Sequence, residues 1–373
     1  MPRTISAPSS ERSQAERDFD LLVGDALERT QDAGEAWCVG LPVPVRYRAA
    51  GAVRAWEVAR RAAGRAGSAL TAALSDVRQP PTQLFELVVD FITDLTSLDM
   101  SGHNGERLTH LCGSSAYWQA FWLRGGALYE PTPALHRMLD VTDVAENMPL
   151  RMIRPPLPAM CIVPIHSGGS GVERFDAVTV FSHAIPNESG SAKRGVTLVV
   201  QVGQRVDVQI FVIDDGCDDT AMQAMDDSIA QVRARGDLDA QELDRVAARV
   251  HHALEYTIKV LLYLAVDDAQ CVQELPYSAA PKSFPGLGKR KREMRLAEVE
   301  NLYDRYLIGP TVLADELPGM TDSSAGHSVS AHWRRGHFRL QPHGPQASLR
   351  KVMFIRPTVV RADRLMAAEA IKR

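Results

Sequence analysis

The sequence predicts an α+β fold with a helical N-terminal part, a central antiparallel sheet with packed helices, and a basic β-hairpin near the C-terminus. Three observations support this prediction. Apolar residues recur at helical spacing in the first third of the chain, short β-branched runs bounded by turn residues fill the middle, and a long apolar helical pattern follows them. Because helices and strands come in separate groups, the pattern favours α+β architecture over regular βαβ alternation.

Length and composition limit the class of protein. The chain has 373 residues, of which 45% are hydrophobic and 24% charged, as in ordinary globular proteins. No apolar run approaches the ~20 residues that cross a bilayer, and the N-terminus lacks the apolar core of a secretory signal. The five cysteines are scattered, so no local zinc or disulfide pair is predicted. We therefore expect a cytoplasmic protein without membrane contact, metal or cofactor.

The N-terminal part is expected to be helical after a disordered leader at residues 1–18. Within the helical region, residues 19–125, an Ala- and Arg-rich run at 49–74 has apolar residues at helical spacing, and Gly64 weakens its middle. After two prolines, Thr82 is a candidate N-cap for a second helix with a clear apolar stripe.

Residues 126–275 are expected to form an α+β core. Four short β-branched runs predict strands at 160–165, 177–182, 197–202 and 206–213. The last two are separated by a short Gly-containing connection, which predicts an antiparallel hairpin. Asp239 then opens, with a capping-box-like pattern, the helix with the strongest apolar face in the chain.

The chain after this core is divided into a linker and a basic C-terminal region. Residues 276–294 are rich in Pro and Gly and predict the linker. Residues 295–373 form the basic region, with a short helix expected at 295–306 and two strands, 332–340 and 349–357, joined as a hairpin.

Charge is distributed unevenly along the sequence. Residues 206–232 contain seven aspartates and no Lys or Arg, whereas residues 327–373 contain ten Lys or Arg and two acidic residues. The aspartates at 214–219 fit a strand end and a helix start better than a metal site, because acidic side chains cap helix amides there. The basic end predicts a polyanionic partner.

Strand alternation gives the predicted hairpin two different faces. Arg335, His337 and Arg339 fall on one face, and Phe338 and Leu340 fall on the other. The second strand completes the apolar face with one of two pairs, Val352 with Phe354 or Met353 with Ile355. Cations interleaved with aromatic rings suit phosphate contact and base stacking. The nucleic-acid-binding residues predicted here are Trp333, Arg334, Arg335, His337, Arg339, Arg350, Lys351 and Arg356.

The same hairpin resembles the C-terminal signature of the second type V-A anti-CRISPR family. The resemblance is carried by the run His332-Trp333-Arg334-Arg335-Gly336-His337-Phe338, a loop containing Gly344, and a basic and apolar strand ending at Pro357. A stretch from Leu128-Tyr129-Glu130-Pro131 to Cys161-Ile162-Val163 is similar to that family's aromatic-led helix, acidic gap and Pro-preceded strand.

The resemblance implies an inhibitor carried by a phage or plasmid. Members suppress production of the CRISPR effector nuclease by recognising its emerging N-terminal peptide and promoting loss of the mRNA under translation. By this resemblance, the partners would be a nascent polypeptide and RNA or the ribosome, and the protein would be an inhibitor and not a conventional enzyme.

The residues themselves are also compatible with two other functions. One is a metal-independent ribonuclease with His337 or His332 as general acid and base, and with Arg335 or Lys351 stabilising the phosphorane. The other is a structural or assembly protein of a phage or plasmid, in which the hairpin arginines pair with the acidic block of the same chain.

Overall fold

The computed structural model describes residues 40–96, 102–165, 175–185, 193–202, 205–234, 239–311 and 332–360. The leader expected at residues 1–18 lies outside these ranges. The chain forms two compact units, which we describe separately. Unit 1 comprises Met1–Gly126 and Ala279–Tyr303, and unit 2 comprises Ala127–Ser278 and Asp304–Arg373. None of the described helices is long and apolar enough to span a membrane.

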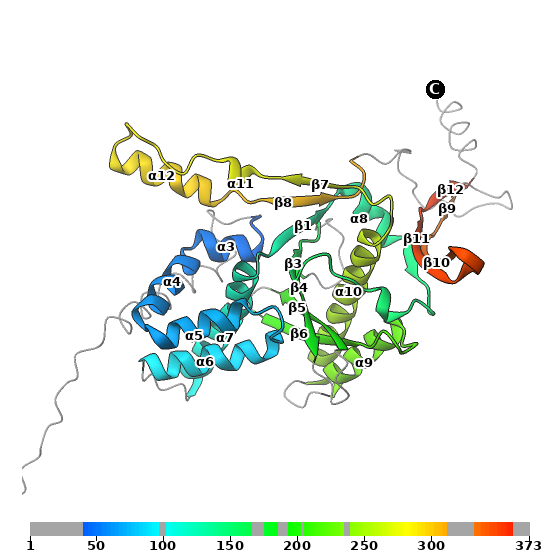
Figure 1. The fold of residues 1–373 in the computed structure, drawn as a ribbon, viewed down its shortest axis with the longest axis horizontal. Helices are drawn as coiled ribbons and strands as arrows, with labels where there is room; N and C mark the ends of the chain where they lie inside the picture. Colours follow the sequence, from blue (N-terminus) through cyan, green and yellow to red (C-terminus); the bar gives the residue numbers. More distant parts are fainter. Residues whose placement is uncertain are drawn as a thin grey trace, which may run out of the picture. The chain divides into compact units, whose positions relative to one another are not determined.

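The described part of unit 1 is helical, as the sequence predicts. Its helices are α3 (Val43–Ala49), α4 (Ala52–Ala62), α5 (Arg65–Ser75), α6 (Pro81–Thr96), α7 (Gly102–Leu123) and α12 (Lys289–Glu300) (Figure 1). The run expected at 49–74 is divided at Gly64, whose positive φ of 58° glycine adopts without the steric penalty of a Cβ. Helix α6 begins at Pro81 instead of after Thr82, because the fixed φ of proline suits the first helical turn. Trp56, Leu84 and Phe121 are fully buried in this unit.

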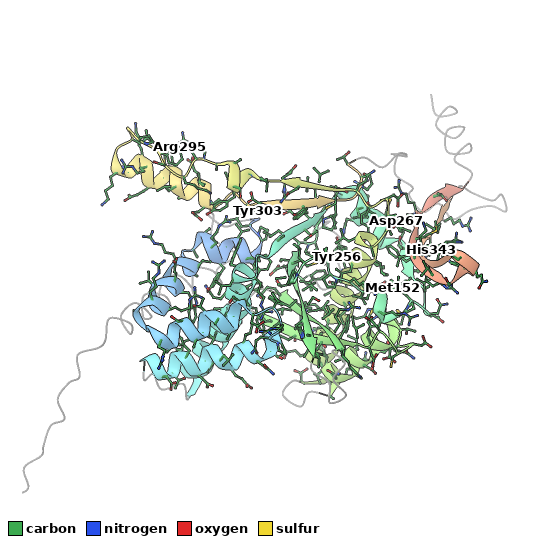
Figure 2. The ribbon with its side chains drawn as sticks, viewed as in Figure 1. Met152, Tyr256, Asp267, Arg295, Tyr303 and His343 are labelled. Atoms are coloured by element: carbon green, nitrogen blue, oxygen red, sulfur yellow. The ribbon has the colours of Figure 1, made fainter. Side chains whose placement is uncertain are left out.

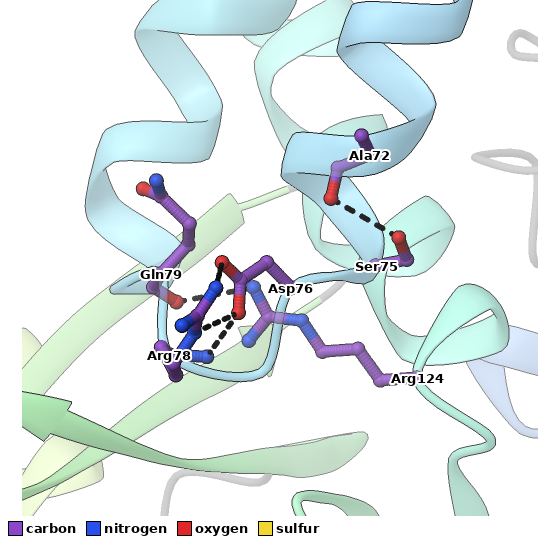
Figure 3. Close-up of polar contacts among 6 residues, drawn as sticks. All are labelled: Ala72, Ser75, Asp76, Arg78, Gln79 and Arg124. Atoms are coloured by element: carbon purple, nitrogen blue, oxygen red, sulfur yellow. Dashed lines mark hydrogen bonds and ion pairs between the residues drawn. The ribbon is translucent and has the colours of Figure 1, made fainter.

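The turn between α5 and α6 is fixed by two arginines (Figure 3). The Asp76 carboxylate accepts hydrogen bonds from the Arg78 backbone N–H and from its Nε, both at 2.9 Å. The buried Arg124, which directly follows α7, donates to the backbone oxygens of Leu74 at 3.0 Å and Gln79 at 3.1 Å. Burial lowers the pKa of Arg124 to about 10, so this guanidinium remains charged at neutral pH while it satisfies the carbonyls of the turn.

We expect Asp76→Asn to destabilise the protein at neutral pH and to have no such effect in strong acid. The hydrogen bonds from Arg78 lower the pKa of Asp76 to about 2, from an ordinary value of 3.8. A carboxylate whose pKa is lower in the folded state stabilises the fold above its unfolded pKa, and this stabilisation disappears as the pH falls through about 2. Urea unfolding of both proteins between pH 6 and pH 2, followed by tryptophan fluorescence, tests this. A difference in stability that stays constant over that range contradicts the prediction.

Unit 2 is built on a seven-stranded sheet in the order β6-β5-β4-β3-β1-β8-β7. The strands are β1 (Ala127–Pro131), β3 (Ala159–Ile162), β4 (Ala177–Ile185), β5 (Lys193–Val202), β6 (Arg205–Ile213), β7 (Cys271–Glu274) and β8 (Arg305–Ile308). The predicted antiparallel arrangement is confirmed for β3 to β6, with Val202 opposite Arg205 in the predicted hairpin. Strand β1 extends it by pairing parallel to both β3 and β8.

The parallel pairing of β1 and β3 uses a helical crossover, since parallel neighbours cannot be joined by a tight turn. The segment Leu128–Pro131 belongs to a strand and not, as the resemblance implied, to the start of a helix. The helix α8 (Pro133–Asp140) begins only after Thr132, whose hydroxyl accepts a hydrogen bond from the Leu135 N–H at 3.2 Å. Short segments β2 (Thr142–Val144) and η2 (Leu150–Met152) follow before β3.

Two helices, α9 (Ala221–Arg233) and α10 (Ala240–Leu264), pack on one face of this sheet (Figure 1). The Asp239 carboxylate caps α10 by accepting from the Glu242 N–H at 2.8 Å, which confirms the predicted helix start. Every residue from 256 to 263 is buried, because this half of α10 forms the centre of the hydrophobic core. Even Lys259 is only 7% exposed, and its ammonium group lies 2.8 Å from the Glu255 carboxylate.

The structure corrects the elements expected between residues 276 and 306. Short helix α11 (Pro276–Ala279) follows β7, and α12 begins at Lys289 and ends at Glu300. The helix predicted at 295–306 is therefore wrong in both limits, and residues 305–308 form strand β8, which lies between β1 and the edge strand β7. The run Arg305-Tyr306-Leu307-Ile308 is too short for its pattern to separate a strand from a helix.

Candidate functional site

The predicted hairpin is confirmed as part of a three-stranded sheet, which we call the ribbon. It consists of β2, β10 (Gly336–His343) and β11 (Leu349–Ile355), joined at the tip by η3 (Pro345–Ala347). Strands β10 and β11 pair antiparallel, with Phe338 opposite Phe354. Strand β2 adds a parallel edge that the sequence did not predict. A separate pair, β9 (His332–Arg334) and β12 (Thr358–Val360), flanks the ribbon in the chain.

One face of the ribbon is anchored in the core of unit 2. Phe338 is fully buried and Val352 is 3% exposed, and both belong to the same cluster as α10. The Phe338 and Phe354 rings stack with centroids 4.8 Å apart, and Tyr263 meets Phe354 edge-on at 5.8 Å. Of the two predicted apolar pairs, Val352 with Phe354 is therefore the one that faces inward.

Gly336, the glycine of the motif that resembles the anti-CRISPR family, lies where neighbouring segments pass too close to leave room for a side chain. A Cβ on Gly336 would lie 2.5 Å from Thr142 Oγ1, 2.8 Å from Pro357 Cδ and 3.0 Å from the Ile355 carbonyl oxygen. The Gly336 N–H also donates to the Val141 carbonyl at 3.1 Å. Only glycine lets β10 pass this close to both neighbouring strands.

The opposite face of the ribbon is mixed in character and not uniformly cationic. Arg339 is exposed on it, and its cross-strand partner is Met353. Lys351 lies opposite Gln341, while His337 is half-buried opposite Ile355. The face therefore combines cations with partly exposed apolar side chains.

Three predicted cations have carboxylate partners in their own chain. The ion pairs are Arg335 with Asp143 at 3.2 Å, Lys351 with Asp267 at 3.1 Å, and Arg356 with Asp268 at 3.7 Å. The side chain of Arg335 is 75% exposed and that of Asp143 61%, so this pair is screened by solvent and contributes little to stability. Figure 2 labels Asp267 at the end of α10 and His343 at the ribbon.

The other three arginines of the prediction have no carboxylate within ion-pairing distance in the described part of the chain. These are Arg334, Arg339 and Arg350, and all three are exposed. Arg350 donates instead to backbone oxygens, including that of Leu349 at 3.1 Å. Six cations and three carboxylates thus leave the ribbon and its flanking residues with a positive charge.

The acidic block does not supply the partners of these arginines, so the predicted internal pairing is wrong for Arg335. Lys193 lies 3.2 Å from Asp214, Arg194 lies 3.5 Å from Asp215, and a third pair joins Arg151 to Asp218. The helix start predicted there is real, but Thr220 is the N-cap, in a reciprocal capping box with Gln223. No cluster of three potential metal ligands occurs among the described residues.

Of the residues predicted for a ribonuclease site, Arg335 lies near His337 and Lys351 does not. Lys351 lies opposite Gln341, four positions along β10 from His337, which corresponds to roughly 13 Å of strand. Arg335 lies nearer, because its partner Asp143 is the register neighbour of His337. The side chains of His332 and Trp333 lie outside the described part, although their backbone forms β9.

Sequence reasoning missed a cavity of about 440 Å³ in unit 2. It lies where three parallel strands β3, β1 and β8 end, the edge at which open sheets commonly bind ligands. At its polar side, Arg305 forms ion pairs with Glu130 at 2.6 Å and Glu274 at 2.9 Å. The apolar lining comprises Pro131, Pro133, Val163, Pro164, Ile165 and Leu307. Because its lining residues come from the ends of three strands that are distant in the sequence, no local sequence pattern predicts this cavity.

Comparison with known proteins identifies the class of protein that carries this ribbon. The AcrVA2-like family, described as the anti-CRISPR type V subtype A2 family, matches residues 129–362. This range is more than half of the chain and contains the ribbon, the cavity and α12. The chain belongs to that family. No curated protein and no solved structure matches it.

Proposed function

We propose that this protein recognises a nascent polypeptide and promotes loss of the mRNA that encodes it, with the ribbon contacting RNA or the ribosome. One observation carries the proposal: Arg334, Arg339 and Arg350 are exposed on or beside an element anchored by the buried Phe338, without carboxylate partners in the described chain. Membership of the anti-CRISPR family supports the inhibitory role.

The physical argument for RNA contact is electrostatic. Guanidinium groups held on a rigid sheet pair with phosphate oxygens and release the counterions condensed on the polyanion. The three exposed ion pairs do not prevent this, since Asp143 holds Arg335 in a solvent-screened contact that a phosphate can replace. Association should therefore weaken steeply as salt rises.

The cavity at the ends of β3, β1 and β8 is our candidate site for the polypeptide. Its volume, about 440 Å³, suits a few side chains of an extended chain rather than a folded domain. Proline, valine and leucine side chains provide apolar contact, and the Glu130–Arg305 pair provides polar groups that can orient a peptide.

The test separates recognition of a peptide from recognition of an RNA sequence. Reporters carrying the first codons of type V effector nucleases would be co-expressed with this protein, and reporter mRNA would be measured. Synonymous recoding, which changes the RNA and keeps the peptide, should leave the loss of mRNA intact. A compensated frameshift, which nearly keeps the RNA and changes the peptide, should abolish it.

Charge reversal then tests the ribbon. We expect Arg334→Glu combined with Arg339→Glu to weaken association with RNA or ribosomes at least tenfold and to stop the loss of reporter mRNA. Arg54→Glu combined with Arg65→Glu, two exposed arginines of unit 1, provides the matched control. Unchanged association and silencing in the ribbon variant would overturn the role of the ribbon.

A further inference from the structure

We propose that the first half of α12 is a second RNA-binding element, which contacts phosphates independently of base sequence. We call it the basic tip, and it consists of Lys289, Arg290, Lys291, Arg292 and Arg295. The inference rests on the proposed function only in taking RNA as the polyanion.

The basic tip makes almost no contribution to packing. All residues from 289 to 298 are exposed, and Val299 is the only buried residue of α12. The helix is held at its other end, where Arg48 of α3 lies 3.3 Å from the Glu300 carboxylate and donates to the Glu300 carbonyl at 3.0 Å. Figure 2 shows side chains radiating from this helix around the labelled Arg295.

The cations of the basic tip are largely unpaired within the described chain. Among the described residues, Arg295 is the one cation of the basic tip with a carboxylate at ion-pairing distance, that of Glu298 at 2.6 Å. Arg292 donates to the Leu287 carbonyl at 3.2 Å. No described carboxylate lies within ion-pairing distance of Lys289, Arg290 or Lys291.

The order of charge along α12 opposes helix stability. The five cations lie in its first two turns together with one carboxylate, Glu293, whereas Glu298 and Glu300 lie in its last turn. A helix favours anions at its N-terminus and cations at its C-terminus, by about 0.3–1 kcal/mol for each charge. A stabilising role therefore does not explain this arrangement, but an anionic ligand would be attracted by the side chains and by the helix dipole together.

The distribution of the cations around the helix favours RNA over a membrane surface. At 100° per residue, the five positions surround the helix and leave no continuous apolar face, which an interfacial membrane helix needs. Residues 289–300 contain no aromatic side chain that could stack on bases. Binding through phosphates alone should be steeply salt-dependent and insensitive to base sequence.

The experiment uses the full chain and fluorescent single-stranded RNAs of two unrelated sequences. We expect the variant Lys289→Gln, Arg290→Gln, Lys291→Gln to bind both RNAs more weakly and to reduce the slope of log Kd against log salt by roughly 2, at about 0.7 per lost phosphate contact. Glutamine keeps the helix propensity, and circular dichroism checks the fold. The matched control replaces Arg54, Arg61 and Arg65, three exposed arginines of the same unit, with glutamine and should bind normally.

The ribbon variant Arg334→Glu, Arg339→Glu separates the two proposals. If the tip variant binds with the wild-type slope while the ribbon variant binds weakly, the tip inference is wrong and the ribbon proposal stands. If the tip variant binds weakly while the ribbon variant binds normally, the tip inference stands and the ribbon proposal is wrong. Wild-type protein that binds neither RNA overturns both. Tip-dependent binding to anionic vesicles as strong as that to RNA would overturn the assignment to RNA.

Discussion

Phe338→Ala is expected to lower the free energy of unfolding of unit 2 by roughly 3–5 kcal/mol, the cost of removing a buried aromatic ring. Phe338 is fully buried, and its ring stacks on Phe354 at 4.8 Å. It joins the ribbon to the cluster built around α10, so its removal leaves a cavity where two parts of the core meet. The same change should reduce RNA association without removing any charge, because the ribbon would lose its rigid support.

Denaturant unfolding followed by far-UV circular dichroism measures this effect, and amide hydrogen exchange in β10 and α10 locates it. Leu349→Ala is the matched control on the same ribbon, since Leu349 is 53% exposed and its loss should cost less than about 0.5 kcal/mol. A destabilisation by Phe338→Ala no larger than that of the control would show that the ribbon is not part of the cooperative core.

The elements that could be predicted from the sequence are those set by local pattern. The capped apolar helix after Asp239 and the hairpin between β5 and β6 are confirmed, because a helical stripe and paired β-branched runs are local signals. The two faces of β10 were also predictable, since alternation alone places Phe338 and Arg339 on opposite sides. The motif around Gly336 indicated the family, which the match over residues 129–362 confirms.

The features that could not be predicted depend on contacts between distant segments. Strands β1 and β8 are short and lie about 175 residues apart in sequence, yet they pair in parallel within the seven-stranded sheet. The partners of Arg335 and Lys351 come from β2 and from the turn after α10, and neither is near them in the chain. The run beginning at Lys289 falls within the linker that the Pro- and Gly-rich composition predicts, although it forms the exposed helix α12.

The ion pairs of Arg305 join the three neighbouring strands β1, β8 and β7 beside the cavity, and breaking them is expected to destabilise unit 2. Arg305 on β8 lies opposite Glu274 on β7 and bonds diagonally to Glu130 on β1. The Glu130 side chain is only 15% exposed, whereas that of Arg305 is 32% exposed. Breaking a fully buried pair costs about 3–5 kcal/mol, because one charge stays buried without its partner.

Arg305→Met is therefore expected to destabilise unit 2 by about 1–3 kcal/mol, a range reduced because solvent partly screens Arg305. If the cost comes from a buried carboxylate without its guanidinium, adding Glu130→Gln should restore part of the stability. Adding Glu274→Gln should restore less, because the Glu274 side chain is 40% exposed and can be hydrated. Denaturant unfolding of the single and double variants gives the coupling energies directly. Rescue by neither glutamine substitution would show that Arg305 stabilises the sheet through packing of its methylenes and not through the charge of Glu130. Equal rescue by both would show that the charge of the exposed Glu274 costs as much as that of Glu130, which contradicts the argument from burial.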